Sequence, residues 1–346
     1  MIEVGILGAT GLVGQRFVEI LVNHPWFKIA SVAASERSAN KKYASLAKWR
    51  LNSPVPESVA ELMVVTPEPK KVGDVSLVFS ALPSSVAGPI EERFAKDGYI
   101  VVSNAASHRM EADVPILNPE ANSNHIQLIE EQRRRRGWDG AILTNPNCTT
   151  AILTLSLKPL MDRFGITRVI VSTMQALSGA GYPGVASLDI VDNVIPFIAR
   201  EEEKVETETK KILGNIGTPA EFKVSASCHR VATLDGHLEA VFVELKERVE
   251  VEDVIEAMKK FKGEPQELNL PTAPKFPLIV RLEQDRPQPR YDRMEERGMS
   301  VVVGRVRKDP ALNGVKYLAL GHNTIRGAAG CAVLIAELLK VKGYLS

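Results

Sequence analysis

The sequence has few cysteines, no long apolar run and almost no net charge, and each shortage argues against a class of protein. Three cysteines in 346 residues are an odd and low number, which argues against a disulfide framework and is typical of a reducing compartment. The 43 basic residues nearly balance the 42 acidic ones, so the chain has no general attraction for nucleic acid or an anionic membrane. An anionic ligand must instead be held by a few placed cations.

The apolar runs give no sign of a membrane segment. They have the length of strands and fall well short of the ~20 residues that span a bilayer. The first residues, Met1-Ile2-Glu3-Val4-Gly5, contain neither a basic segment nor a cleavage site, so we expect no signal peptide and a cytoplasmic location. The four arginines at 133–136 end an expected helix and complement its dipole. We therefore expect neither a nucleic-acid partner nor a membrane partner.

Apolar runs alternate with amphipathic ones over the first 145 residues. The apolar runs predict strands at 2–7, 28–34, 63–66, 74–82, 99–103 and 141–144. Helical spacing of apolar residues predicts helices at 11–23, 86–96 and 125–136. Strands that alternate with helices indicate a parallel, doubly wound sheet.

The pattern changes near residue 148, where longer strands follow one another with fewer helices between them. Strands are expected at 167–175, 222–231, 237–245, 278–282, 300–306 and 315–320, and helices at 149–164, 201–213, 252–261 and 324–342. Such an order indicates a mostly antiparallel sheet with helices on one face, which is the α+β class. We expect two domains, 1–147 and 148–322.

A glycine-rich segment lies between the first expected strand and the first expected helix. It consists of Gly8, Ala9, Thr10, Gly11, Leu12, Val13 and Gly14, a variant of the dinucleotide-binding fingerprint. Glycines permit the tight turn and the close approach of the backbone to a pyrophosphate, whose charge then meets the helix N-terminus. This segment predicts a dinucleotide site.

The end of the second expected strand indicates which dinucleotide binds. An NAD enzyme usually has a carboxylate there for the ribose 2′-hydroxyl. This chain has Ser35, Arg37 and Ser38, whose hydroxyls and guanidinium suit a 2′-phosphate and favour NADP. Glu36 leaves NAD open, because a small rotation would present its carboxylate instead.

Cys148 is the candidate nucleophile. The segment Asn145-Pro146-Asn147-Cys148 precedes a long expected helix, whose N-terminus would lower the pKa of the thiol. The free N–H groups there, with the Asn147 amide, can hold an oxyanion. A buried structural cysteine remains an equal alternative on these residues alone. Among the six histidines we favour His237, after a turn, as the proton-transfer partner, although spacing does not select it.

Several motifs in order along the chain resemble aspartate-semialdehyde dehydrogenase, in its archaeal and fungal branch. They are Gly8-x-Thr10-Gly11-x-Val13-Gly14, Ser107-His108-Arg109, Asn145-Pro146-Asn147-Cys148-Thr149, Gln175-Ala176-x-Ser178-Gly179-Ala180-Gly181-Tyr182-Pro183-Gly184, Glu202-x-Lys204 with Glu208-Thr209-x-Lys211-Ile212-Leu213, and Arg230-Val231 with His237. The resemblance covers nearly the whole chain. It implies a Rossmann domain, to which segment 323–346 returns, and an α+β domain that carries both catalysis and the subunit interface.

The resemblance also implies a role for each matching residue. Cys148 would be the nucleophile and His237 the general acid and base, assisted by Gln175 and Asn147. Arg230 would bind the substrate carboxylate, Glu202 the ammonium, and Lys204 and Arg109 the phosphate. Further NADP contacts would come from Gly179 and Asn323, and no residue is expected to bind a metal.

The reaction so implied is NADP-dependent reduction of L-4-aspartyl phosphate to L-aspartate 4-semialdehyde through a thioester, in the biosynthesis of lysine, threonine and methionine. The enzyme would be a homodimer or homotetramer. A malonyl- or succinyl-CoA reductase on the same scaffold is one alternative, but it has no need for a glutamate that binds an ammonium. N-acetyl-glutamyl-phosphate reductase and glyceraldehyde-3-phosphate dehydrogenase fit the motifs less well. A non-enzymatic NADP sensor explains the glycine turn but not the catalytic set.

Overall fold

Two sheets, each with its own helices, lie side by side in the computed structural model, which describes residues 1–345. The first sheet contains β1 (Ile2–Leu7), β2 (Phe27–Ala33), β3 (Leu77–Ser80), β4 (Ile100–Ser103) and β5 (Ala141–Thr144). Its order is β2-β1-β3-β4-β5, and every neighbouring pair is parallel. Its central strands are buried on both faces because helices cover the two sides. The doubly wound Rossmann-type fold is confirmed.

The helices of the first half carry the chain between these strands. They are α1 (Leu12–Leu21), η1 (Glu36–Ser38), α2 (Tyr43–Leu46), α3 (Glu57–Ala60), α4 (Pro69–Val72), α5 (Ser84–Lys96), α6 (Pro119–Asn122), η2 (Ser123–Gln127) and α7 (Leu128–Arg136). The strand expected at 63–66 is wrong. That segment makes isolated bridges, from Val65 to Ala33 and from Met63 to Lys42. Pro67 follows directly and has no N–H to continue a ladder.

The second sheet is wider and mixed. It contains β6 (Ile166–Gln175), β7 (Lys223–Arg230), β8 (His237–Leu245), β9 (Leu278–Arg281), β10 (Val301–Lys308) and β11 (Gly314–Gly321). Its order is β7-β6-β8-β11-β10-β9. Three neighbouring pairs are antiparallel, and β6–β7 and β9–β10 are parallel. The six strands expected in this half are confirmed, as is the α+β class.

Helices pack on one face of this sheet. The longest is α8 (Cys148–Phe164), and α10 (Glu201–Ile212) and α11 (Val251–Lys260) lie beside it. Shorter elements are η3 (Leu177–Ala180), α9 (Ser187–Ile190), α12 (Glu264–Glu267), α13 (Pro289–Asp292) and η4 (Glu295–Gly298). No helix within residues 1–345 combines the length and the apolar character needed to cross a bilayer.

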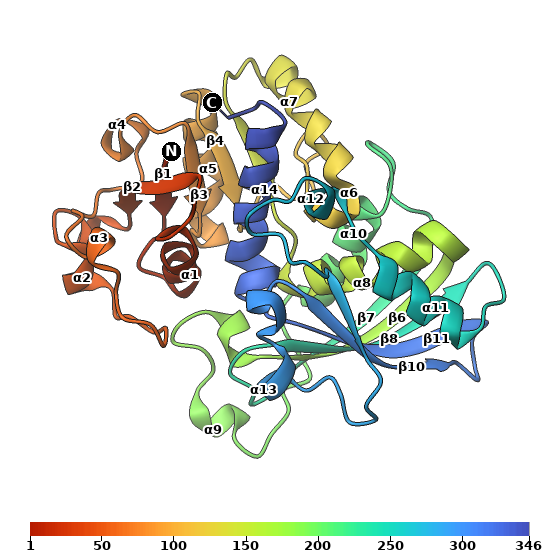
Figure 1. The fold of residues 1–346 in the computed structure, drawn as a ribbon. Coiled ribbons are helices and arrows are strands. Elements are labelled where there is room, and N and C mark those ends of the chain that lie inside the picture. The colour runs from red at the N-terminus through yellow and green to blue at the C-terminus, as the bar shows by residue number, and fades with distance from the viewer. Residues whose placement is uncertain (346) are drawn as a thin grey trace.

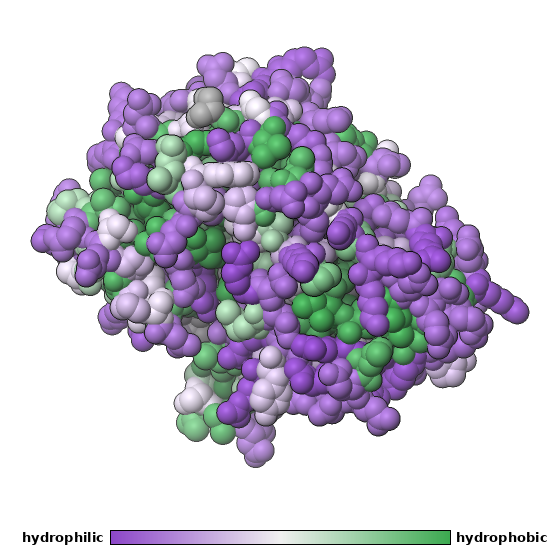
Figure 2. Space-filling model, in the orientation of Figure 1, coloured by the Kyte–Doolittle hydropathy of each residue, from purple (hydrophilic) through white to green (hydrophobic). Residues whose placement is uncertain are grey.

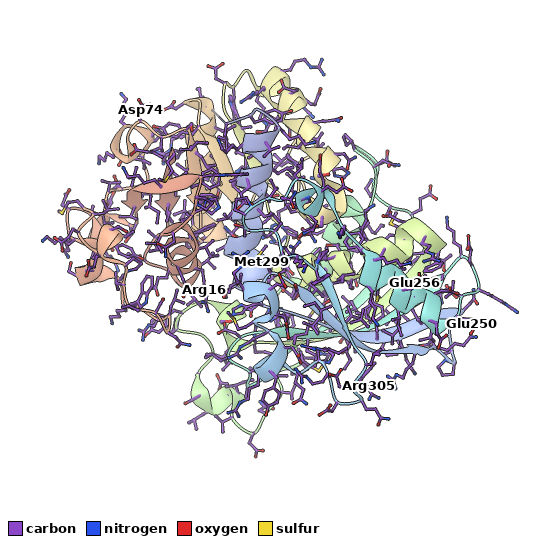
Figure 3. The ribbon with its side chains drawn as sticks, viewed as in Figure 1. Arg16, Asp74, Glu250, Glu256, Met299 and Arg305 are labelled. Atoms are coloured by element: carbon purple, nitrogen blue, oxygen red, sulfur yellow. The ribbon has the colours of Figure 1, made fainter. Side chains whose placement is uncertain are left out.

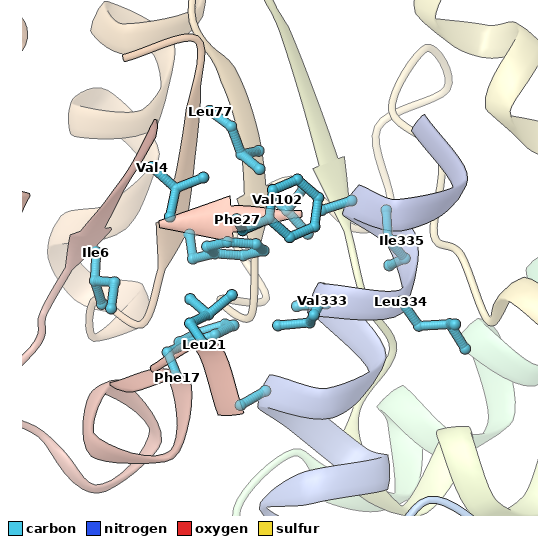
Figure 4. Packing of buried hydrophobic residues seen from close by; sticks show 14 of the residues in the cluster. Val4, Ile6, Phe17, Leu21, Phe27, Leu77, Val102, Val333, Leu334 and Ile335 are labelled. Atoms are coloured by element: carbon cyan, nitrogen blue, oxygen red, sulfur yellow. The ribbon is translucent and has the colours of Figure 1, made fainter. Parts of the chain in front are cut away.

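The end of the chain returns to the first sheet. The single helix expected there is in fact a π-helical turn, η5 (Ile325–Ala329), followed by α14 (Gly330–Val341). Val333 and Ile335 of α14 belong to the same buried cluster as Phe27 of β2, and Figure 4 draws them close together. Arg16 of α1, labelled near the centre of Figure 3, donates from Nε to Thr324 Oγ1 over 3.1 Å. These contacts join the last segment to the first half.

Candidate active site

A cavity of about 710 Å³ lies where the carboxyl ends of the first sheet meet the second half of the chain. It is lined by residues of both halves, among them Gly11, Leu12, Val13, Arg109, Asn147, Cys148, Ser178, Gly179, Glu201, Lys204, Arg230, Asn323 and Gly327. Crevices at the carboxyl ends of parallel strands are the usual ligand sites of such sheets. Most of the residues expected to bind or react therefore share one cavity.

Asn147 caps the helix that begins with Cys148. Its Oδ1 accepts from the backbone N–H groups of Thr149 and Thr150, at 3.0 and 3.2 Å. Its Nδ2 donates to Glu201 Oε1 at 2.9 Å. The N–H groups that we expected to hold an oxyanion are thus bound by the cap itself, and that expectation is wrong for these two groups. The backbone N–H of Cys148 is not among those that Asn147 binds.

The Cys148 thiol contacts the His237 imidazole. Sγ lies 3.2 Å from Nε2, and the ring's Nδ1 accepts from the backbone N–H of Ala176 at 3.0 Å. A backbone N–H can only donate, so Nδ1 is unprotonated and the neutral ring has its proton on Nε2, facing the sulfur. Cys228 and Cys331 are fully buried core residues. Of the three cysteines, Cys148 is the one that lines the cavity and contacts a histidine.

The electrostatics of this pair differ from our expectation. Burial, followed by the negative charge of Glu201, raises the pKa of the Cys148 thiol to about 12, against the opposing effect of Arg230 and Arg109. Burial, followed by Arg230, lowers the pKa of His237 well below its usual range. The lowered thiol pKa that we expected from the helix N-terminus is wrong, because desolvation outweighs the dipole. Burial favours the uncharged form of both groups.

A buried carboxylate, Glu201, connects the groups around the thiol. Its Oε1 accepts from Asn147 Nδ2 and from Gln175 Nε2, each at 2.9 Å. Its Oε2 lies 3.5 Å from Lys204 Nζ. Two amides and an ammonium around one carboxylate fix its position. Glu201 is thus the negative group of the cavity.

Glu202, the residue expected there, points elsewhere. Its Oε1 accepts from the backbone N–H of Cys228 on β7 at 3.0 Å, so the structure places it outside the cavity lining. The signal that could have found Glu201 is helical spacing. Residues three apart share a helix face, as Glu201 and Lys204 do, whereas residues two apart, as Glu202 and Lys204 are, do not.

Two arginines add to the positive charge that Lys204 brings to the cavity. Arg230 donates from Nη1 to Ala176 O at 2.7 Å. Arg109 donates from Nη1 to Glu208 Oε1 at 3.0 Å, and the other oxygen of that carboxylate accepts from the backbone N–H of Asn147 at 2.7 Å. Sequence reasoning missed the positioning role of Glu208, which lies two turns along α10 from Glu201 on the same face. The cavity can hold an anionic ligand at two points.

The glycine turn has the shape that a dinucleotide site requires. Gly8 has φ of +77°, and a Cβ there would lie 2.6 Å from a backbone oxygen after β3. A Cβ on Gly14 would lie 2.3 Å from Gly8 O. Gly11 begins α1 without a side-chain cap in the described part of the chain, and it lines the cavity with Leu12 and Val13. The helix N-terminus therefore offers its N–H groups to an anion.

Other expected cofactor residues lie on two sides of this turn. Ser35, Arg37 and Ser38 lie just beyond β2, where the first two are exposed and Ser38 is half-buried. None of them lines the cavity, and neither does Thr10. At the opposite end, Asn323 donates from Nδ2 to Ser178 Oγ and accepts at Oδ1 from Gly236 N, both at 2.8 Å. A Cβ on Gly179 would lie 2.8 Å from Arg230 Nη1, so this position needs glycine.

Two family models match most of the chain. The model described as the NAD binding domain of semialdehyde dehydrogenase matches residues 3–129, and the model of its dimerisation domain matches residues 157–326. Residues 130–156, between the two matches, include the first part of α8, where the chain passes from one sheet to the other.

Full-length relatives and solved structures resemble the whole chain. An aspartate-semialdehyde dehydrogenase of Methanothermobacter thermautotrophicus is 56% identical over 98% of this chain and 99% of its own. A malonyl CoA reductase (NADP) of Metallosphaera sedula is 45% identical over 99% and 98%. The crystal structure of aspartate semialdehyde dehydrogenase with NADP from Candida albicans matches with a TM-score of 0.91 and 41% identity over 100% of both chains.

Proposed function

We propose, because the chain belongs to the aspartate-semialdehyde dehydrogenase family, that it is an NADP-dependent oxidoreductase that reduces L-4-aspartyl phosphate to L-aspartate 4-semialdehyde and releases phosphate. This step serves the biosynthesis of the aspartate family of amino acids, which includes lysine, threonine and methionine. The observation that carries the proposal is the 3.2 Å contact of Cys148 Sγ with His237 Nε2 in a cavity that also holds Glu201 and Arg230.

The substrate is held through its two charged ends. The Arg230 guanidinium, whose Nη1 is tied to the backbone, forms a bidentate pair with the carboxylate. Glu201 binds the ammonium, in place of the Glu202 of our expectation, since it is the carboxylate that lines the cavity. Lys204 and Arg109, which also line it, take the phosphate. These contacts place the acyl carbon next to Cys148.

The first chemical step is transfer of the acyl group to sulfur. The Cys148 sulfur attacks the acyl carbon, and the C–O bond to phosphate breaks. Overall, the thiol loses its proton and phosphate leaves as hydrogen phosphate, which carries that proton. The Nε2–H of His237 and the charge of Arg230 stabilise the sulfur as it loses its proton. The backbone N–H of Cys148 is the donor that remains for the tetrahedral oxygen. Gln175 contributes by fixing Glu201.

The second step reduces the thioester. NADPH, when bound, supplies the hydride for the thioester carbon. Hydride addition leaves the oxyanion of a hemithioacetal, whose C–S bond then breaks to give the aldehyde and the Cys148 thiolate. The Nε2–H of His237 donates a hydrogen bond to the departing sulfur, which takes its proton from water. Ala176 matters here because its N–H keeps the ring proton on the nitrogen that faces Cys148.

The cofactor lies along the glycine turn. The N–H groups at Leu12 and Val13 bind its pyrophosphate, and Asn323 and Gly179 contact its nicotinamide end. Ser35, Arg37 and Ser38 contact the 2′-phosphate, in line with their place beyond β2 at the adjacent strand end. This placement supports a preference for NADP over NAD.

Domain and subunit organisation follow the packing. Residues 1–147 with 323–345 form the cofactor domain, and 148–322 form the catalytic domain, as the shared apolar cluster of α14 and the first sheet supports. Ser346, the last residue of the expected segment 323–346, lies outside the described residues. The second domain also forms the contact between subunits of a homodimer or homotetramer. The match of residues 157–326 to the dimerisation-domain model supports this assignment. The enzyme works in the cytoplasm.

The decisive assay is phosphate-dependent reduction of NADP with aspartate semialdehyde as substrate. Activity that requires both phosphate and the aldehyde is expected, and its absence contradicts the proposal. A malonyl- or succinyl-CoA reductase is the second candidate because of the relative from Metallosphaera sedula. Malonyl-CoA with NADPH should therefore be assayed in parallel. Glu201 favours the amino-acid substrate, since a CoA ester has no ammonium at that position.

A further inference from the structure

Besides Glu201, the protein buries the carboxyl group of Glu239 near the site. Glu239 lies on β8, the strand that begins with His237. It lies two residues beyond His237 on β8, so both side chains point to the same, inner face of the sheet. Glu239 is fully buried, and among residues 1–345 neither carboxylate oxygen has a hydrogen-bond partner. A buried carboxyl in this condition is uncommon and calls for a function.

The strand register places Glu239 directly behind the active site. Thr173 on β6 lies opposite both Glu239 on β8 and Cys228 on β7. The next row toward the cavity contains Gln175, opposite Arg230. Thr173 Oγ1 connects the rows by donating to Gln175 Oε1 at 3.2 Å, and the amide of Gln175 in turn binds Glu201. The row of Glu239 and Thr173 thus lies directly behind the row of Gln175 and Arg230 and is hydrogen-bonded to it.

Among residues 1–345, Glu239 forms no salt bridge and no hydrogen bond to a cation. The titratable groups that interact with it electrostatically are Glu201 of α10, Cys228 of β7 and Tyr317 of β11, and the Tyr317 hydroxyl is hydrogen-bonded to Ser156 of α8. Burial, followed by the negative charge of Glu201, raises the pKa of Glu239 well above its usual range. Glu201, in contrast, has two amide donors and Lys204. The surroundings of Glu239 therefore favour its protonated form, whereas those of Glu201 supply hydrogen-bond donors and a cation to a carboxylate.

We propose that Glu239 and Glu201 form a coupled pair, in which Glu239 holds a proton so that Glu201 keeps the single negative charge that binds the substrate ammonium. The inference rests on the proposed function for the role of Glu201, but the protonation of Glu239 does not. Glu239 is on this view a positioning residue, which acts through the charge of its neighbour and does not touch the substrate.

Infrared spectroscopy of the intact enzyme without substrate tests the pair. The wild type is expected to show the carbonyl band of a protonated carboxyl at pH 7, and Glu239→Gln is expected to lose it. Glu244→Gln, on the same strand but at a partly exposed site near Arg168, is the matched control and should retain the band. In Glu201→Gln the band should disappear on titration at a lower pH than in the wild type, because the neighbouring charge is gone.

Thermal unfolding gives an independent reading. Glu239 ionises in the unfolded chain but stays neutral in the folded one, so the wild type loses stability as pH rises above the usual carboxyl range, while Glu239→Gln does not. The difference in Tm, variant minus wild type, should grow between about pH 5 and pH 8. The proposal is overturned if Glu239→Gln retains the carbonyl band, or if the Tm difference between variant and wild type stays flat or falls as pH rises. A failed aldehyde assay would instead count against the reaction alone.

Discussion

At the level of single residues, the contact between Cys148 Sγ and His237 Nε2 makes two substitutions unequal. Cys148→Ala removes the atom that bears the acyl group, so no activity above background is expected. His237→Asn removes the imidazole whose Nε2–H faces the sulfur. Acid–base assistance by such a group is worth about 10²–10⁴ in rate, so kcat should fall by roughly that factor and remain measurable. Steady-state kinetics on both variants, with Tm as a check on folding, decide the matter. Equal and mild losses would contradict the thioester scheme.

A neighbouring pair of glutamates provides a matched comparison. Glu201→Gln removes the charge next to Lys204, and kcat/KM for aspartate semialdehyde should fall about 10- to 100-fold, because a hydrogen bond to a charged group is worth roughly 1.5–3 kcal/mol. Glu202→Gln keeps an oxygen for Cys228 N and should be close to wild type. Succinate semialdehyde, which lacks the amine, should not distinguish Glu201→Gln from wild type. A larger effect at Glu202 would return the ammonium site to that residue.

The raised thiol pKa has a measurable pH dependence. Because burial raises the pKa of Cys148 to about 12, the thiolate fraction should increase by about tenfold for each pH unit from 7 to 9. The rate of alkylation by iodoacetamide should follow that slope, and Cys148→Ala should take up no label because Cys228 and Cys331 are buried. A rate that levels off below pH 8 would show instead that the helix N-terminus controls the thiol.

The residues also show how far the sequence could predict the site. The motifs identify Cys148, Gln175, Arg230 and His237, and the structure brings them to one cavity or its wall. Their roles remain predictions until the kinetics above are measured. Helical spacing in the sequence pairs Glu201 with Lys204, but which face of α10 lines the cavity depends on how the helix is rotated against the sheet. The thiol pKa depends on desolvation, which no local pattern reports.

At the level of elements, the π-helical turn of η5 positions the nucleophile. A Cβ on Gly327 would lie 2.7 Å from Cys148 Cβ and 2.8 Å from its Cα. Turns of this type often occur at functional sites. The buried ion pair of Arg326 with Glu120 holds the turn in place. The sequence predicted one continuous helix here, because a π turn has no distinct apolar period.

Gly327→Ala tests this contact. The added methyl group must displace Cys148 or the turn, and a shift of about 1 Å near the reacting atoms can cost on the order of 10²-fold in rate. We expect kcat to fall by about that factor with a modest loss in Tm. Gly88→Ala in α5, whose Cβ would meet its nearest atom at 3.7 Å, is the control and should keep wild-type kinetics. Wild-type kinetics for Gly327→Ala would mean that the turn has no part in catalysis.

At the level of the whole molecule, one segment leaves apolar side chains without cover. Residues 182–197, which include α9, project at the lower edge of Figure 1, and Figure 2 shows hydrophobic side chains there. The most exposed of them are Tyr182, Leu188, Val191, Val194 and Phe197. An apolar segment of this size is typical of a surface that contacts another chain. From the sequence we expect the subunit contact in the second half of the chain. The exposed apolar side chains lead us to expect that residues 182–197 form part of it.

The same segment is tied to the substrate site. Ile195 and Arg230 exchange two backbone hydrogen bonds, at 3.1 and 2.9 Å. We expect the wild type to sediment as a dimer or larger, and the double variant Leu188→Asp/Phe197→Asp to sediment as a monomer. The monomer should lose activity chiefly through a higher KM, since the unsupported segment no longer fixes Arg230. Met63→Asp, an exposed apolar site in the other domain, should change neither property. A fully active monomer would show that this segment serves neither assembly nor substrate binding.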